Sequence, residues 1–390
     1  MTTVFDSGVQ GPATHALVIG VGGYRNARDA AGPHGQAPTG VPADDVHAYR
    51  DLAAEFPARA STARSAARFA EWLIGEQADD AIAPLGSVEL LMSEPQQQPR
   101  FNGVPVDEPA FDAVHAAFSR WYARCDADPG NVAVLFFSGH GVEHADRHIL
   151  ALEDVGSAPL NFFESAINVQ HLVRGMQRCA ALTQCYYIDA CRSTSEAVDE
   201  LDDIQCRPLL QPARRQVHRD TTIIRSTRAA QAAYGDGDGI TLFTTHLLTA
   251  LDGAAAEQVS GRWEVRQDRL ATTLAELLAG DDRAAARGQQ PDGGSSGRRS
   301  IRRLRHPPRI QFRLGCDPGA ALTAADLRLR DPNSGTEQSR PAAAAPWEDT
   351  ADAAVYEYSA SFRSGAFQDA QHALWLWPPP RFVFDLTVGS

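Results

Sequence analysis

Two apolar runs, each ending abruptly at small or polar residues, constrain the fold of this chain more than any other feature. Residues 132–137 (Val-Ala-Val-Leu-Phe-Phe) lead into 138–141 (Ser-Gly-His-Gly), and residues 185–188 (Cys-Tyr-Tyr-Ile) lead into 189–193 (Asp-Ala-Cys-Arg-Ser). Neither run alternates between apolar and polar residues, as expected of strands covered on both faces in a parallel sheet. Ligands of open α/β sheets bind beyond the carboxyl ends of such strands. We therefore expect an imidazole and a thiol at the same sheet edge.

This pair of side chains suits an enzyme with a cysteine nucleophile. A free thiol is mostly protonated at neutral pH, and a nearby base or cation raises its thiolate fraction. Gly139 and Gly141 flank His140, so a substrate backbone could approach closely and an amide could bind an oxyanion. A lone cysteine or histidine is usually an ordinary core residue. The prediction therefore depends on finding Cys191 and His140 together.

The spacing of the two signals is similar to that of caspases, in which the histidine precedes a Q-A-C-[RQG]-G motif by about 50 residues. This chain keeps Ala-Cys-Arg but has Asp189 in place of Gln and Ser193 in place of Gly. At these residues it resembles the caspase-like cysteine peptidases of family C14, within them the bacterial metacaspase and paracaspase branch, which has Asp two residues before the nucleophile. CHAT peptidases share the fold and a Gly-His-Gly motif, but their nucleophile segment is less similar to Asp-Ala-Cys-Arg-Ser of this chain. They are the second choice.

The resemblance extends over most of the first 280 residues, including a strand at 15–21, a helix start at 43–46 and the block 237–244. It implies an α/β fold: a caspase-like three-layer sandwich with a mostly parallel central sheet and helices on both faces. It also implies that Cys191 attacks a peptide carbonyl, that His140 protonates the leaving amine, and that the backbone amides of Gly141 and Cys191 hold the oxyanion. No acid is assigned as a third catalytic member.

The same resemblance implies specificity for basic residues. Asp189 would point into the pocket for the substrate side chain that precedes the cut, and a carboxylate pairs best with the guanidinium of arginine. Asp45 would be a second pocket acid, or else a helix cap. Ser226, which follows a further strand at 221–224, is a third candidate for substrate binding. Arg228 would instead favour an acidic substrate residue, but the acids outnumber it.

Clusters of Gly, Pro and Ser, which favour turns and loops, divide the chain into four parts. We expect a loosely ordered polar leader at 1–14, the peptidase domain at 15–280, a Gly/Asp/Arg-rich linker at 281–309, and a small β-rich region at 310–390. Helices are predicted at 108–124, 168–178, 241–251 and 267–279 from apolar spacing and capping residues.

Composition and residue spacing argue against several classes of protein. No apolar run approaches 18 residues and no signal peptide is evident, so we expect a cytoplasmic protein with no membrane association. The six cysteines show no CxxC pair or zinc-ligand spacing, so we expect neither a disulfide framework nor a metal or other cofactor; a calcium requirement is left open. The net charge of −13 disfavours nucleic-acid binding. The arginine-rich segment 297–306 is therefore interpreted as a solvated linker or a protease-sensitive hinge.

These features predict a cysteine endopeptidase that cuts protein or peptide substrates after arginine. A non-catalytic caspase-fold signalling scaffold is the alternative of a different class. Caspase-like enzymes are commonly latent until a segment after the cysteine is cut, and the polar loop 196–220 contains Arg214 and Arg215 followed by Gln216. We expect activation by the chain itself, an upstream protease or a regulator, with cleavage after Arg214 or Arg215. The segment near Arg303 is the second candidate.

Overall fold

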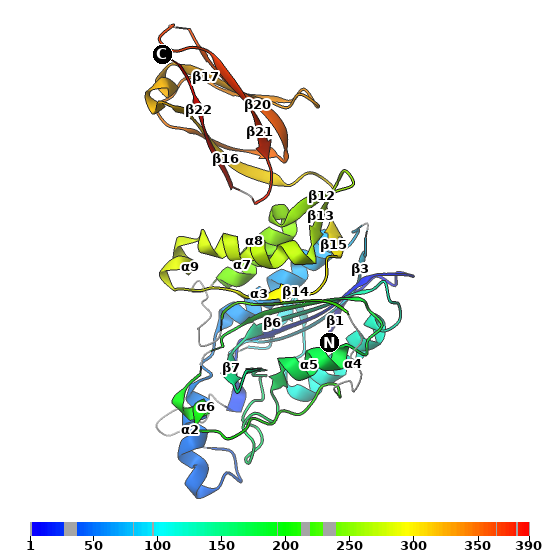
Figure 1. The fold of residues 1–390 in the computed structure, drawn as a ribbon. Coiled ribbons are helices and arrows are strands. Elements are labelled where there is room, and N and C mark those ends of the chain that lie inside the picture. Colours follow the sequence, from blue (N-terminus) through cyan, green and yellow to red (C-terminus); the bar gives the residue numbers. More distant parts are fainter. Residues whose placement is uncertain are drawn as a thin grey trace. The chain divides into compact units, whose positions relative to one another are not determined.

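The structure is a computed structural model that describes residues 2–26, 37–80, 82–95, 97–192, 194–211, 219–228, 239–363, 365–379 and 381–389. It forms two compact units (Figure 1). The first contains Met1–Leu248 and Gln267–Arg302, and the second contains Thr249–Arg266 and Arg303–Ser390. Both residues predicted to carry the chemistry, at 140 and 191, belong to the first unit.

A seven-stranded sheet organises the first unit, in the order β1-β3-β2-β6-β10-β11-β14. The five inner strands are parallel, and the two edge strands are antiparallel to their neighbours. The mostly parallel sheet is thus confirmed. The strands are β1 (Thr3–Asp6), β2 (Thr14–Val21), β3 (Leu85–Ser93), β6 (Val132–Gly139), β10 (Thr183–Ala190), β11 (Asp220–Arg225) and β14 (Asp292–Ser295).

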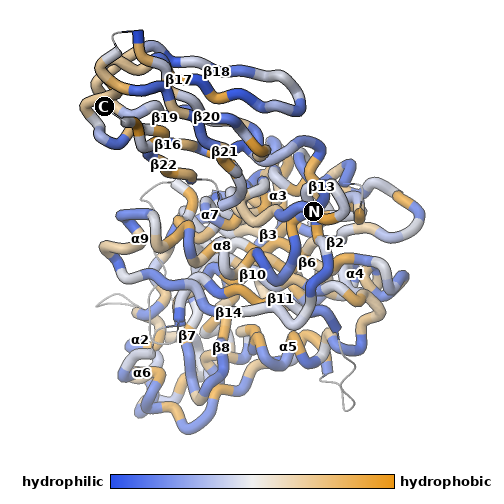
Figure 2. The backbone as a smooth tube through the Cα atoms, turned by 45° about the horizontal axis from the view of Figure 1, so that its top comes forward, coloured by the Kyte–Doolittle hydropathy of each residue, from blue (hydrophilic) through white to orange (hydrophobic). Residues whose placement is uncertain are grey.

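Helices cover both faces of this sheet, with α3, α7 and α8 on one face and α4 and α5 on the other (Figure 1). Consecutive residues of β6 and β10 therefore pack against different layers, and all are buried. Phe136 stacks on Phe69 of α3 at 4.5 Å between ring centroids, while Trp121 of α4 donates to the carbonyl of His15 at 2.9 Å. This double burial explains the unbroken apolar runs, visible as hydrophobic segments in Figure 2.

The helices predicted at 108–124, 168–178, 241–251 and 267–279 are present close to those positions, as α4 (Phe111–Cys125), α5 (Val169–Met176), α7 (Leu242–Thr249) and α8 (Gln267–Ala279). Helix α2 (Val46–Ala54) follows the predicted helix start at 43–46. The sequence did not predict α3 (Ala60–Trp72), α6 (Glu196–Asp199) or α9 (Asp282–Ala286). The Asn168 side chain caps α5 by accepting the N–H of His171 at 3.0 Å. Among the helices described, none is long and apolar enough to cross a membrane.

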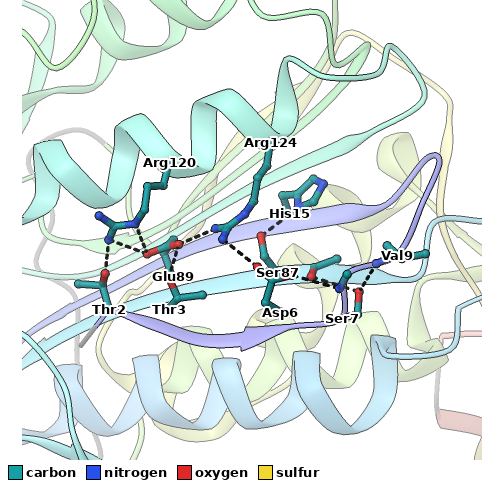
Figure 3. Close-up of polar contacts among 12 residues, drawn as sticks. Thr2, Thr3, Asp6, Ser7, Val9, His15, Ser87, Glu89, Arg120 and Arg124 are labelled. Atoms are coloured by element: carbon teal, nitrogen blue, oxygen red, sulfur yellow. Dashed lines mark hydrogen bonds and ion pairs between the residues drawn. The ribbon is translucent and has the colours of Figure 1, made fainter.

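The first residues differ from the expected loose leader, because Thr3–Asp6 forms β1 beside β3. A fully buried carboxylate, Glu89 of β3, anchors this edge (Figure 3). It accepts from Arg120 at 2.9 Å, Arg124 at 2.6 Å and the Thr3 hydroxyl at 2.8 Å. A buried charge must be paired and hydrogen-bonded, and β1 supplies part of that pairing. This network joins residues far apart in the sequence, so local sequence patterns did not predict it.

The expected linker at 281–309 also differs, because it contributes α9, β14 and β15 (Ser300–Arg303). Two of its arginines are largely covered and paired: Arg302 pairs with Glu76 at 3.2 Å, and Arg303 pairs with Glu264 at 2.9 Å. Arg299 likewise pairs with Asp220. Local composition suggested a flexible segment because these acids lie far away in the sequence.

The second unit is β-rich, as predicted for the C-terminal region, but it also takes in residues 249–266. Two of its sheets have the orders β19-β16-β22 and β18-β17-β20-β21. Tyr358 donates to the carbonyl of Gly315 at 3.1 Å. The strands are β12 (Ala256–Val259), β13 (Arg262–Arg266), β16 (Arg309–Asp317), β17 (Ala325–Arg330), β18 (Glu337–Arg340), β19 (Trp347–Asp352), β20 (Ala354–Phe362), β21 (Ala370–Leu376) and β22 (Arg381–Thr387).

Candidate active site

The structure brings the predicted histidine and cysteine together at one edge of the sheet. Strands β6 and β10 are parallel neighbours, and Gly139 lies opposite Ala190 as the last pair of their ladder. His140 and Cys191 are therefore the next residue on each strand. Neighbouring strands lie about 4.8 Å apart. A nucleophile and a base can thus meet here without any rearrangement of the sheet.

Packing fixes the ring of His140 on several sides. Nε2 lies 2.7 Å from the carbonyl oxygen of Pro57, and the rings of Tyr24 and Phe56 lie 5.3 and 6.0 Å away between centroids. Because a carbonyl only accepts hydrogen bonds, Nε2 carries the proton and Nδ1 keeps its lone pair in the neutral ring. Burial lowers the pKa of His140 to about 4. The imidazole is therefore a neutral base at pH 7.

Two of these partners were missed at the sequence level. The Pro57 carbonyl, in the segment between α2 and α3, is a backbone group and leaves no residue signature. Tyr24 follows the carboxyl end of β2, and its hydroxyl accepts the N–H of His140 at 2.6 Å. Its place just beyond a parallel strand was the signal that could have identified it. Burial raises the pKa of Tyr24 above its usual range, so the phenol stays protonated.

Asp189 lies buried beneath the nucleophile in a ring of hydroxyl groups. One carboxylate oxygen, Oδ2, accepts from Thr241 and from Thr244 at 3.0 Å, and Ser138 is 3.5 Å away. The other oxygen, Oδ1, is buried and has no hydrogen-bond partner in the described part of the chain. Burial raises the pKa of Asp189 to about 6, although the hydroxyl donors, Thr241 first, oppose that rise.

The remaining predicted substrate residues lie in different surroundings. Ser226 is fully buried and donates to the carbonyl of Ala190 at 3.1 Å, so it supports the nucleophile turn; a contact with substrate stays a prediction. Asp45 is exposed at the start of α2, where its side chain makes no capping hydrogen bond. Its role as a second pocket acid also stays a prediction. Arg214 and Arg215 lie outside the described residues.

Cys191 is one of two cysteines that are not fully buried, the other being Cys206. It is half-buried, whereas four of the others are buried. Burial raises the pKa of Cys179 and Cys185 to about 11 and that of Cys206 to about 12. All six thiols are free of disulfides. Cys179, Cys185 and Cys206 are therefore poor nucleophiles at neutral pH, because little thiolate forms.

A cavity lies beside the residues that surround His140. It has a volume of about 700 Å³ and is lined by Tyr24, Phe56 and Pro57, the residues that hold His140, and by the carboxyl groups of Glu94 and Glu153. Neither His140 nor Cys191 lines it. Within the described ranges, no group of three or more His, Cys, Asp or Glu residues could hold a metal ion.

Comparison with known proteins places this site in a family. The sequence model of the caspase domain, Peptidase C14, matches residues 92–290, just over half of the chain, and includes both His140 and Cys191. The uncharacterized protein y4kE of Sinorhizobium fredii is 29% identical over 210 residues, which is 52% of this chain and 60% of that protein. This chain thus spans less than two thirds of that relative's length.

Among solved structures, caspase-1 from Spodoptera frugiperda is similar over 74% of this chain and 88% of its own, with 13% identity and a TM-score of 0.40. Family membership follows from the sequence match, which spans the strand edge where the histidine and the cysteine meet. The chain belongs to the caspase-domain family of cysteine peptidases.

Proposed function

We propose that this protein is a cysteine endopeptidase that cuts protein or peptide chains after arginine, with Cys191 as nucleophile and His140 as its base and acid. The observation that carries the specificity is the carboxylate of Asp189. It is buried two residues before the nucleophile, and its Oδ1 is unpartnered among the described residues. A buried carboxylate without a cation is costly, and a substrate guanidinium would supply the missing charge and donors.

In the proposed reaction, the free Nδ1 of His140 takes the proton of the Cys191 thiol. The sulfur attacks the carbonyl carbon after the substrate arginine, and a tetrahedral oxyanion forms. The imidazolium then gives its proton to the leaving amine, the C–N bond breaks, and an acyl-enzyme remains. Water, deprotonated by the same ring, releases the acid and restores the thiol. The Pro57 carbonyl steadies the ring by holding Nε2–H, in the place where other enzymes use a carboxylate.

The backbone around both residues supports an oxyanion site at the amides of Gly141 and Cys191. The carbonyl of His140 accepts from Ala151 at 3.0 Å in the ladder between β7 (Gly141–His144) and β8 (Arg147–Leu150). Because bonded and non-bonded pairs alternate in an antiparallel ladder, the next N–H, that of Gly141, points away from β8. The amide of Cys191 is similarly directed away from Ser226, which holds the preceding carbonyl.

The proposal is tested with fluorogenic peptides that differ only in the residue before the cut: Arg, Lys, Ala or Asp. We expect the Arg peptide to be cut fastest, followed by Lys, because the planar guanidinium pairs with both oxygens of a carboxylate. Preference for Asp, or no cleavage of any peptide by a folded protein, would contradict the proposal.

The same panel has an expected pH dependence. Since kcat/KM reports the free enzyme, the Arg value should fall tenfold per pH unit below about 6, where the raised pKa leaves Asp189 protonated and neutral. The Ala value should persist toward pH 4, where His140 becomes protonated. A common acidic limb for both peptides would separate Asp189 from specificity.

We further propose that the chain is latent until it is cut after Arg214 or Arg215. The specificity inferred from Asp189 fits these residues, which follow the nucleophile in the polar loop. Arg303 is the weaker candidate, because it lies in β15 and pairs with Glu264 at 2.9 Å. Intact-mass analysis of the wild type, alone and mixed with a Cys191→Ala chain, should show a cut in 212–218 before activity rises. Full activity of the uncut chain would rule out latency.

A further inference from the structure

A second buried histidine contacts the main chain of the nucleophile. His148 lies in β8 and is fully buried, and its Nε2 is 3.0 Å from the carbonyl oxygen of Cys191. Because the carbonyl is an acceptor, Nε2 donates. Burial lowers the pKa of His148 to about 3, helped by the charge of Arg225. The ring is therefore neutral throughout the working pH range and serves as a hydrogen-bond donor of fixed orientation.

The chain makes room for this contact at Gly141. A Cβ atom there would lie 2.8 Å from the Cys191 carbonyl oxygen and 2.8 Å from Nε2 of His148. Any side chain at 141 would push these two groups apart. The closeness of the β7–β8 hairpin to the nucleophile thus depends on a glycine whose backbone angles any residue could adopt, so the glycine is needed for space rather than conformation.

His148 completes a set of bonds on both sides of Cys191. The carbonyl of Ala190 accepts from Ser226 at 3.1 Å, and the carbonyl of Cys191 accepts from His148. Because peptide units are planar, these two bonds fix the planes that flank the Cα atom of Cys191. The directions of its N–H and of its Cα–Cβ bond, from which Sγ extends, follow from that backbone conformation. The next side chain, Arg192, also binds Glu143 of the hairpin at 2.7 Å.

The hydrogen bonding of the ring is one-sided. Nδ1 of His148 is buried and has no hydrogen-bond partner in the described chain, so Nε2, which binds the Cys191 carbonyl, is the ring nitrogen with a partner there. A buried polar atom without a partner reduces stability. Stability alone therefore does not account for an imidazole at this position, whereas support of the nucleophile does.

We infer that His148 is a positioning residue for the nucleophile: it acts through the Cys191 carbonyl and touches neither substrate nor leaving group. The inference rests on the proposed peptidase function. Small displacements of a reacting atom can cost about 10² in rate. Removing the donor should therefore lower kcat by about that factor, while KM, set by the side-chain pocket around Asp189, changes by less than about tenfold.

The test compares three variants at one position. Gln can place its amide N–H near the position of Nε2, whereas Asn is too short and Leu has no donor. We expect His148→Leu and His148→Asn to lose kcat and His148→Gln to recover most of it. His15→Leu is the control. It also removes a histidine hydrogen bond, that of Nδ1 to the Ser87 hydroxyl at 2.9 Å, but His15 lies at the amino end of β2, away from the carboxyl strand ends that form the site. It should keep wild-type kcat.

A second readout needs no substrate. Hydrogen–deuterium exchange of the segment 189–192 should be faster in His148→Asn than in the wild type or His148→Gln, at equal Tm. Asn and Gln variants with the same kcat and the same exchange would overturn the inference even if the Leu variant fails to fold. If the wild type cuts no peptide, the proposed function fails, while exchange still decides whether His148 holds the nucleophile.

Discussion

Cys191→Ala should abolish peptide cleavage, with a loss of about 10⁶ in kcat, the magnitude seen when a catalytic nucleophile is removed. The change deletes one sulfur atom from a half-buried side chain, so the fold and Tm should be almost unchanged. Cys206→Ala is a matched control, because Cys206 is the other half-buried thiol and burial raises its pKa to about 12. Equal loss in both variants, or activity retained in Cys191→Ala, would remove Cys191 from the mechanism.

Asp189→Asn should have the second-largest effect, and it should be confined to basic substrates. Truncating the charge of a buried pair typically costs about 2–5 kcal/mol, which is roughly 30- to 5,000-fold in kcat/KM for the Arg peptide. Asn keeps the size of the side chain and can still bond with Thr241 and Thr244, so the core should tolerate it. The acidic limb near pH 6 should disappear with the carboxylate.

The Ala peptide is the internal control for this variant. Its kcat/KM should change little, because Asp189 touches neither Cys191 Sγ nor the scissile bond in the proposed mechanism. If Asp189→Asn keeps the preference for Arg, the pocket acid lies elsewhere, and the exposed Asp45 becomes the residue to test. Equal losses on both peptides would instead indicate a structural role beneath the nucleophile.

The parallel sheet and the meeting of His140 with Cys191 were predictable because both depend on local patterns. Unbroken apolar runs indicate strands buried on both faces, and chemistry gathers at their carboxyl ends. The Pro57 carbonyl, the Tyr24 hydroxyl and the His148 bond were not predictable in this way. Each joins segments far apart in the chain, and each pairs a side chain with a backbone atom of a kind that leaves no signature in the sequence.

The predicted linker at 281–309 was wrong for a related physical reason. The segment 281–309 has the Gly, Asp and Arg content of a linker, but its strand β14 gains its stability from pairing with β11. The arginines there are matched by acids at Glu76, Asp220 and Glu264. Composition reports the average preference of a segment, whereas these pairings depend on what the completed fold places beside it.

The interleaved path of the chain changes what a cut near Arg303 could accomplish. The chain leaves the first unit after Leu248, contributes residues 249–266 to the second unit, and returns at Gln267. Proteolysis after Arg303, one residue beyond the third of the three crossings, would leave the other two crossings intact. The fragment 304–390 would remain associated with the hairpin of β12 and β13 through non-covalent packing such as that of Trp263 against Trp377, 4.9 Å between ring centroids. Nicking and release are therefore separate events in this protein, and a nicked chain would still migrate at the intact size under native conditions.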